Sequence, residues 1–284
     1  MPKKVWVHGP ISLDTVVYIS KFPTPGSFLN SLRTEDRTGG SSANVALGLC
    51  TANVDTGFIT YLGNDQIGKE LLNVLEQSLI QDLVITHIED KTNHALVLVD
   101  ENLERTIITM STPHLRELRI KNASLKSGDV VAFILWREEF LQDLVKAQEM
   151  GCFTIVGAEA LGDSNVNYAD LLIGSRKDIP SNLKIQDNLQ RFRTIVLTDG
   201  ANGATAYRDG VEIHQQSFRV NVKDTTGAGD AFIAGFLAST SYQLNLKYSL
   251  EIAAKWAASA VQSESSVPPS FDVVKAQWGI DLIP

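Results

Sequence analysis

Six short apolar runs constrain the fold of this chain more than any other feature. They occupy residues 5–7, 56–61, 130–135, 153–156, 171–173 and 194–197. Each run is continuous rather than alternating, which is typical of parallel strands buried on both faces of a sheet. Further patterns indicate helices at 44–51, 138–150, 228–242 and 246–262. The sequence therefore predicts an α/β fold, with a mostly parallel central sheet covered by helices on both faces.

Two segments interrupt this alternation. Residues 15–37 are extended and polar and contain Pro23, Pro25 and Gly26. Later in the chain, the apolar stretches 95–99 and 105–109 flank a polar turn, as in a β-hairpin. We expect these strands to pair into a small separate sheet.

The composition excludes several classes of protein. The 284 residues contain 44% hydrophobic residues, with no internal repeat or long linker, so one large unit is expected. The net charge of −8 provides no basic surface for nucleic acid or an anionic membrane. No apolar run approaches the ~20 residues of a membrane-spanning helix, and the run near the N-terminus is too short for a signal peptide. We expect a soluble cytoplasmic protein.

Cysteine and histidine spacing gives no sign of a metal site held by the protein. Cys50 and Cys152 are the only cysteines, are far apart, and have no ligand-spaced partner. We interpret them as reduced core residues. The five histidines likewise lack the spacing that a transition metal requires.

The segment from Asp224 to Phe232, with the sequence DTTGAGDAF, is the strongest functional motif. Gly227 and Gly229 allow a tight turn whose amides, including that of Ala228, can point at one anion at the start of a helix. Asp230 would lie in the first turn of that helix and could accept the proton of an attacking hydroxyl. The alternative is a helix cap that follows an ordinary turn.

Two further motifs accompany this one. The sequence GGSSANVA at 39–46 places a glycine pair before an apolar helix, and TDGANG at 198–203 follows a predicted strand. With DTTGAGDAF, these motifs resemble those of the ribokinase/PfkB-type carbohydrate kinases, whose C-terminal signature is DTxGAGD followed by a small residue and Phe. The motifs extend across most of the chain. The resemblance therefore applies to the whole protein and not to one loop.

The resemblance implies a fold and an activity. It implies a single ribokinase-like kinase domain over residues 1–284, with a lid formed by about 15–37 and 93–109. In several relatives this lid forms a homodimer contact. It also implies ATP as the donor, Mg²⁺ as its counterion, and transfer to a hydroxymethyl group of a small sugar.

The residues expected to bind the acceptor come from three places in the sequence. Asp14 matches the family's acidic residue that accepts hydrogen bonds from two sugar hydroxyls, although it could instead cap a turn. It also occupies one of the glycine positions of a dinucleotide-binding turn, which argues against NAD or FAD. Gly39, Gly40 and Asn44 match sugar-contacting positions, with a helix entry capped by a serine as the alternative. Arg137 is expected at the carboxyl edge of the sheet, where it contacts the acceptor or balances neighbouring glutamates.

The residues expected to lie near the nucleotide follow from the same resemblance. The residues expected near ATP are Thr198, Gly200, Gly203, Thr226 and Ser175. Relatives usually have N-x-x-E after the strand at 171–173, where this chain has Ser175, Arg176, Lys177 and Asp178. We expect Asp178 to take over the acidic role and to hold Mg²⁺ through water. The loop at 263–268 lacks the glycine found in many relatives, so activation by a monovalent cation is not carried over.

Two alternatives remain open beside a sugar kinase. One is a nucleoside kinase of the same fold, for which Tyr18, Phe22 and Phe28 could provide an aromatic clamp. The other is a sensor of sugar or nucleotide that has lost activity. A sugar phosphate would require several cations, and the hairpin at 95–109 has only Arg105. Lys21, Arg33 and Arg37 are the other basic residues that could serve.

Overall fold

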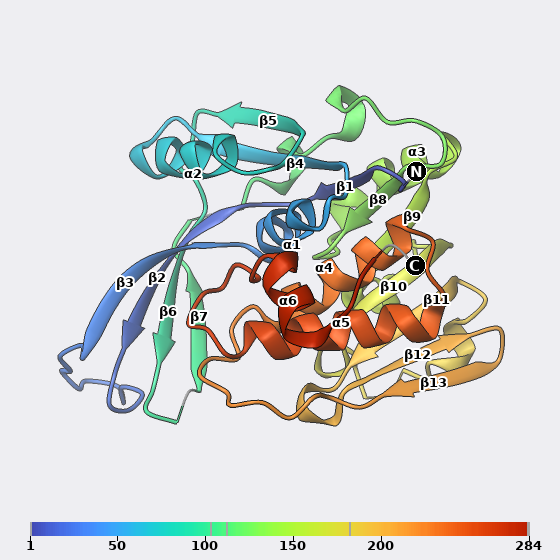
Figure 1. Cartoon of the computed structure of the whole chain (residues 1–284). Coiled ribbons are helices and arrows are strands. Elements are labelled where there is room, and N and C mark those ends of the chain that lie inside the picture. Colours follow the sequence, from blue (N-terminus) through green and yellow to red (C-terminus); the bar gives the residue numbers. More distant parts are fainter. Residues whose placement is uncertain (1, 103, 112, 182, 283–284) are drawn as a thin grey trace.

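A nine-stranded sheet forms the centre of the molecule (Figure 1). The computed structural model describes residues 2–102, 104–111, 113–181 and 183–282. The strand order is β13-β12-β11-β10-β9-β8-β1-β4-β5, and the seven strands from β11 to β5 are parallel. These seven are β1 (Val5–His8), β4 (Thr56–Gly63), β5 (Asp82–Ile88), β8 (Val130–Phe133), β9 (Phe153–Gly157), β10 (Ala169–Ser175) and β11 (Phe192–Thr198). An antiparallel pair, β12 (Ala204–Arg208) and β13 (Val211–Gln215), completes one edge.

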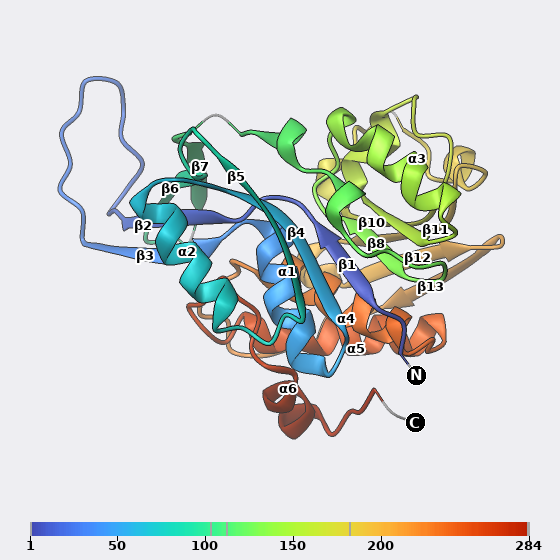
Figure 2. The ribbon, with the colours of Figure 1, turned by 90° about the horizontal axis from the view of Figure 1, so that it is seen from above.

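Helices cover both faces of this sheet, as the sequence predicts. They are α1 (Ser41–Leu49), α2 (Gln66–Glu76), α3 (Leu141–Glu149), α4 (Ala228–Ser241), α5 (Leu246–Ala260) and α6 (Phe271–Trp278). Successive strand residues point to opposite faces, so Val5 and Val7 pack in the core cluster of α1, α4 and α5, while Trp6 packs in the cluster of α3. Figure 2 shows α5 and α6 on the opposite side of the sheet from α3.

Some element bounds differ from the predictions. The strand expected at 130–135 ends at Phe133, and the helix expected at 138–150 is a 3₁₀ turn, Glu138–Phe140, followed by α3. The β12–β13 hairpin was not predicted, although its turn has a local signal. Asp209 and Gly210 both have positive φ, the combination that the Asp-Gly turn of a two-residue hairpin requires.

A second sheet of four strands projects from one end of the main sheet (Figure 1). Its order is β3-β2-β6-β7, formed by β2 (Ser12–Tyr18), β3 (Arg33–Gly39), β6 (His94–Val99) and β7 (Arg105–Thr109). The predicted hairpin is therefore present as β6 and β7, and we call these four strands the small sheet. It exposes Ile107 and Ile108, and Met110, directly after β7, is exposed as well. Its roles as a lid and a dimer contact stay predictions.

Both cysteines are buried, Cys50 in the core cluster of α1 and Cys152 in that of α3. Within the described part of the chain, no helix is long and apolar enough to cross a membrane.

Candidate active site

A pocket of about 510 Å³ lies between the carboxyl ends of the main strands and the small sheet. It brings together residues that the sequence analysis selected from distant segments. Those that line it are Asp14, Gly40, Asn44, Arg137, Ser175, Asp178, Thr198, Thr226, Gly227, Gly229 and Asp230. The remaining four, Gly39, Ala228, Gly200 and Gly203, are not among its lining residues.

The DTTGAGD segment forms a turn that leads directly into α4. Gly227 precedes the helix in the left-handed conformation, with φ of 76°. A Cβ at this position would lie 2.2 Å from the Ser266 carbonyl oxygen, so only glycine fits. Gly229 faces open space in the pocket. The start of α4 therefore presents backbone amides and the positive end of its dipole to the pocket.

Asp230 lies in the first turn of α4, as predicted. Burial raises the pKa of its carboxyl group to about 6, and the nearby charge of Asp14 contributes in the same direction. Hydrogen bonds from Asn44 and Ser41 and the positive charge of Arg105 oppose this rise. The Asn44 Nδ2 donates to Asp230 Oδ2 at 2.8 Å. Asp230 can therefore hold a proton at moderately acidic pH and release it near neutrality.

Asp14 lies on β2 close to the glycine pair. Burial raises the pKa of its carboxyl group, and the Ser12 hydroxyl donates to Asp14 Oδ1 at 2.7 Å. A Cβ at Gly39 would lie 2.1 Å from the Asp14 Cγ, so any side chain there would displace the carboxylate. Although Gly39 does not line the pocket, it leaves the space that Asp14 occupies. Ser12 was missed in the sequence, although a strand places residues i and i+2 on one face.

The glycine pair also starts α1. Gly40 is the N-cap residue with φ of 89°, and no side chain caps this helix. The serine cap considered as an alternative is therefore not used. The buried Ser42 hydroxyl instead donates to the His8 carbonyl oxygen at 3.4 Å. This start places Asn44 beside Asp230, and its Oδ1 has no hydrogen-bond partner among the described residues.

The expected nucleotide residues divide into two groups. Ser175 and Thr198 end adjacent parallel strands in register and both line the pocket. Gly200 and Gly203 lie in the following turn, with φ of 53° and 92°. A Cβ at Gly203 would lie 2.1 Å from the Gln215 carbonyl oxygen, so the turn alone explains this glycine.

The pocket also contains a cation and two carboxylates at the strand ends. Arg137 contacts Glu159, with 3.6 Å between Nη1 and Oε1, and donates to the Trp136 carbonyl oxygen at 2.6 Å. Glu159 follows β9 and Asp178 follows β10, and both line the pocket. Sequence reasoning missed Glu159, although a carboxylate directly after a buried strand is a local signal. Among the described residues there is no group of three or more His, Cys, Asp or Glu side chains that could hold a metal ion.

Two arginines of the small sheet reach the turn before α4. Arg37 Nη1 lies 3.2 Å from Asp224 Oδ2, and Asp224 Oδ1 accepts from the Thr226 amide at 2.7 Å. Arg105 Nη1 donates to Thr226 Oγ1 at 3.1 Å. The small sheet is thus joined to the glycine turn before α4 through Asp224 and Thr226.

The model of the PfkB family carbohydrate kinases matches residues 3–271 of this chain. The chain therefore belongs to this family. It is 24% identical to the ribokinase of Haemophilus influenzae, over 94% of this chain and 96% of that protein. It is 26% identical to the nucleoside kinase of Methanothermobacter thermautotrophicus, over 96% of both chains.

Solved structures show the same fold. The ribokinase of Thermotoga maritima superposes with a TM-score of 0.83 and 21% identity, over 99% of this chain and 100% of that one. The ribokinase of Cryptococcus neoformans in complex with ADP gives a TM-score of 0.73 and 20% identity, over 97% and 99%. The described architecture is therefore a ribokinase fold, as the sequence motifs predict.

Proposed function

We propose that this protein is an ATP-dependent kinase that phosphorylates a hydroxymethyl group of a small sugar. The observation that carries this proposal is Asp230, a carboxylate with a raised pKa in the first turn of α4, beside a glycine turn that is open to the pocket. Family membership supports a kinase. ATP as donor is supported by the ADP bound to the related fungal ribokinase.

In the proposed reaction, the acceptor hydroxyl attacks the γ-phosphorus of ATP. A new O–P bond forms, the bond from the γ-phosphorus to the bridging oxygen breaks, and ADP leaves with the electron pair. The hydroxyl proton passes to Asp230. The amides of Gly227, Ala228 and Gly229 stabilise the charge on the transferred phosphoryl group.

Mg²⁺ would neutralise phosphate charge in this reaction. It typically keeps several waters and binds through one or two carboxylates together with substrate phosphates. Asp178 and Glu159 fit that requirement, because both carboxylates line the pocket at the ends of adjacent strands, beside Ser175. Asp178 remains our candidate for holding Mg²⁺ through water, and Glu159 is added to it.

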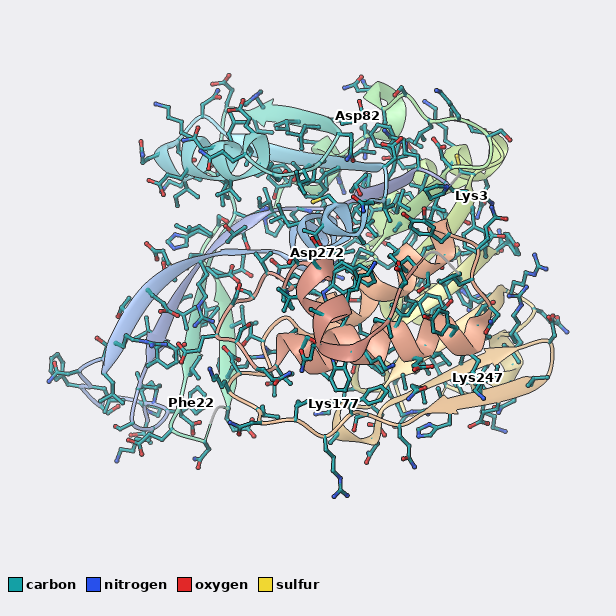
Figure 3. All side chains as sticks on the ribbon, viewed as in Figure 1. Lys3, Phe22, Asp82, Lys177, Lys247 and Asp272 are labelled. Carbon is teal, nitrogen blue, oxygen red and sulfur yellow. The ribbon has the colours of Figure 1, made fainter. Side chains whose placement is uncertain are left out.

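The contents of the pocket favour a sugar over a nucleoside. Asp14 offers two acceptor oxygens for a pair of hydroxyls, and the unpartnered Asn44 Oδ1 can accept from a third. The aromatic clamp considered for a nucleoside is missing from the pocket lining, in which Phe140 and His94 are the only residues with an aromatic ring among those described. Phe22, for example, lies near the outer end of the small sheet (Figure 3).

A sugar phosphate is disfavoured for a related reason. Of the basic residues considered for one, Arg33 and Arg37 are paired with carboxylates, and neither they nor Lys21 line the pocket. Arg105 does line it, but one cation does not supply the several that a buried dianion requires. A sensor without activity would have no use for the Asp230 base. The nucleoside kinase remains the second candidate, because a nucleoside kinase is among the relatives.

An acceptor screen tests the proposal. Purified protein is incubated with Mg-ATP and single monosaccharides, nucleosides or sugar phosphates, and ADP release is measured. We expect release that depends on an unphosphorylated or singly anionic sugar. Turnover only with nucleosides or sugar phosphates would overturn the acceptor assignment and leave the kinase assignment intact. No turnover with any acceptor would favour the sensor.

A further inference from the structure

The small sheet carries three arginines that contact the main part of the molecule, and they differ in how their charge is balanced. Arg33 pairs with Glu264 at 2.9 Å, and Arg37 pairs with Asp224 at 3.2 Å. Arg105, in contrast, forms no ion pair within the described part of the chain. Its one described side-chain hydrogen bond goes to the neutral Thr226 hydroxyl.

This unpaired guanidinium lies at the anion-binding turn. Thr226 directly precedes Gly227, and Arg105 lines the same pocket as Gly229 and Asp230. Its charge also lowers the pKa of the Asp230 carboxyl group, which places it within electrostatic reach of the base. A guanidinium has five N–H donors and stays charged at all relevant pH values. Most of these donors are free for an anion that enters the pocket.

We propose that Arg105 is a catalytic residue that contacts the phosphoryl group while it moves from ATP to the acceptor. This inference rests on the proposed kinase function. During transfer, negative charge spreads over the phosphoryl oxygens and the bridging oxygen of the leaving ADP. Arg105 gives up no proton in this step, because the acceptor proton goes to Asp230. Its N–H groups instead bind the phosphoryl oxygens beside the glycine turn.

An alternative is that Arg105 only holds the small sheet in place through its contact with Thr226. The two roles predict different losses of kcat when the side chain is shortened. Loss of a positioning contact to the Thr226 hydroxyl should lower kcat by roughly tenfold, whereas stabilisation of transition-state charge by an arginine is worth ~10³-fold or more in kcat. A guanidinium ion added in solution can supply the charge that stabilises the transition state, but it cannot restore the positioning contact.

The test compares Arg105→Met, Arg105→Lys and Arg105→Ala with Arg33→Met as the matched control. Arg33 also joins the small sheet to the main part of the molecule, but it is paired with Glu264 and lies outside the pocket. We expect Arg105→Met to lower kcat by on the order of 10³ or more, with KM for ATP and acceptor within about threefold of wild type. Arg105→Lys should lose less, because it keeps the charge. Guanidinium ions should partly restore kcat in Arg105→Ala and not in Arg33→Met.

Three outcomes would overturn the inference. A kcat of Arg105→Met close to wild type, with Asp230→Asn inactive, would remove Arg105 from catalysis and leave the kinase function standing. An increase confined to the acceptor KM would assign Arg105 to acceptor binding. Wild-type protein without any acceptor-dependent ADP release would overturn both the proposed function and this inference.

Discussion

Asp230 and Asp14 are two carboxylates in one pocket whose surroundings suit them to different tasks. Burial raises the pKa of both, but only Asp230 lies at a helix N-terminus beside a glycine turn. Its pKa of about 6 keeps it ionised at neutral pH and close to the value that favours a general base. Asp14 accepts from Ser12 and faces the region where the acceptor would bind.

The raised pKa of Asp230 predicts the pH dependence of the reaction. A base must be deprotonated, so kcat/KM should rise with pH up to about 6 and then level off. The Ser41 hydroxyl stabilises the ionised form. Ser41→Ala should therefore raise the pKa of Asp230 and move this acid limb to higher pH. A pH profile of both proteins checks this, and a limb that moves to lower pH would contradict it.

Asp14 should affect the affinity for the acceptor and not the affinity for the nucleotide. We expect Asp14→Ala to weaken acceptor binding by about 1.5–3 kcal/mol, the value of hydrogen bonds to a charged group, with unchanged nucleotide affinity. Titration calorimetry with each ligand measures both effects. Asp36→Ala is the matched control, because Asp36 is an exposed carboxylate on the neighbouring strand, outside the pocket. Equal losses for both ligands would mean that Asp14 supports the scaffold only.

The small sheet and the turn before α4 are joined by a mostly buried ion pair. Arg37 is only 11% exposed and contacts Asp224, the Tyr18 hydroxyl at 2.6 Å, and Glu35. Asp224 also contacts the turn before α4, because its other carboxylate oxygen accepts a hydrogen bond from the Thr226 amide. The conformation of this turn should therefore depend on the position of the small sheet.

A double-mutant cycle tests this dependence. Removing either partner leaves a partly buried charge unpaired, so Arg37→Met and Asp224→Asn should each lower kcat/KM by roughly 10- to 100-fold. Because both variants break the same contact, the double variant should lose less than the sum, with a coupling of about 1–3 kcal/mol.

The pair Arg33–Glu264 provides the control for that cycle. It also joins the small sheet to the main part of the molecule, but both side chains are about half exposed. Its coupling should lie within about 0–1 kcal/mol, as for other surface ion pairs. Additive effects of Arg37→Met and Asp224→Asn would contradict the proposed connection.

At the scale of the whole molecule, the strands and helices that have a local sequence pattern could be predicted from the sequence. Continuous apolar runs indicated six of the seven parallel strands, and the glycine turn before Asp230 indicated the start of α4. The missing strand, β5, is mostly only partly buried and mixes polar with apolar residues, so its sequence gives a weaker signal. Within α3, Val145 is 43% exposed and Ala147 is buried, so the apolar residue types alone do not identify the buried face of this helix.

The contacts that complete the site could not be predicted in this way. Arg105 and Thr226 are separated by 121 positions, and Arg37 and Asp224 by 187. No local periodicity relates residues so far apart. Their meeting depends on how the small sheet packs over the main one, which a single sequence does not encode as a pattern. Gly39 was selected as a sugar-contacting residue, whereas the structure shows that it leaves the space that Asp14 occupies.

The central claim is that Asp230 acts as the base of an ATP-dependent phosphoryl transfer. The most direct test is the kcat of acceptor-dependent ADP release at about pH 8 for wild type and Asp230→Asn. We expect a loss of on the order of 10² to 10⁴ in the variant.

Stability separates this loss from unfolding. The folded pKa of Asp230, about 6, exceeds its ordinary value of 3.8, so its contribution to stability is lost as pH rises from about 4 to 6. Above that range the ionised carboxylate costs about 1.4 kcal/mol per pKa unit, so Asp230→Asn should be at least as stable as wild type. We expect a folded variant that is at least as stable as wild type and has almost no turnover. An Asn variant with wild-type kcat would show that Asp230 is not the base.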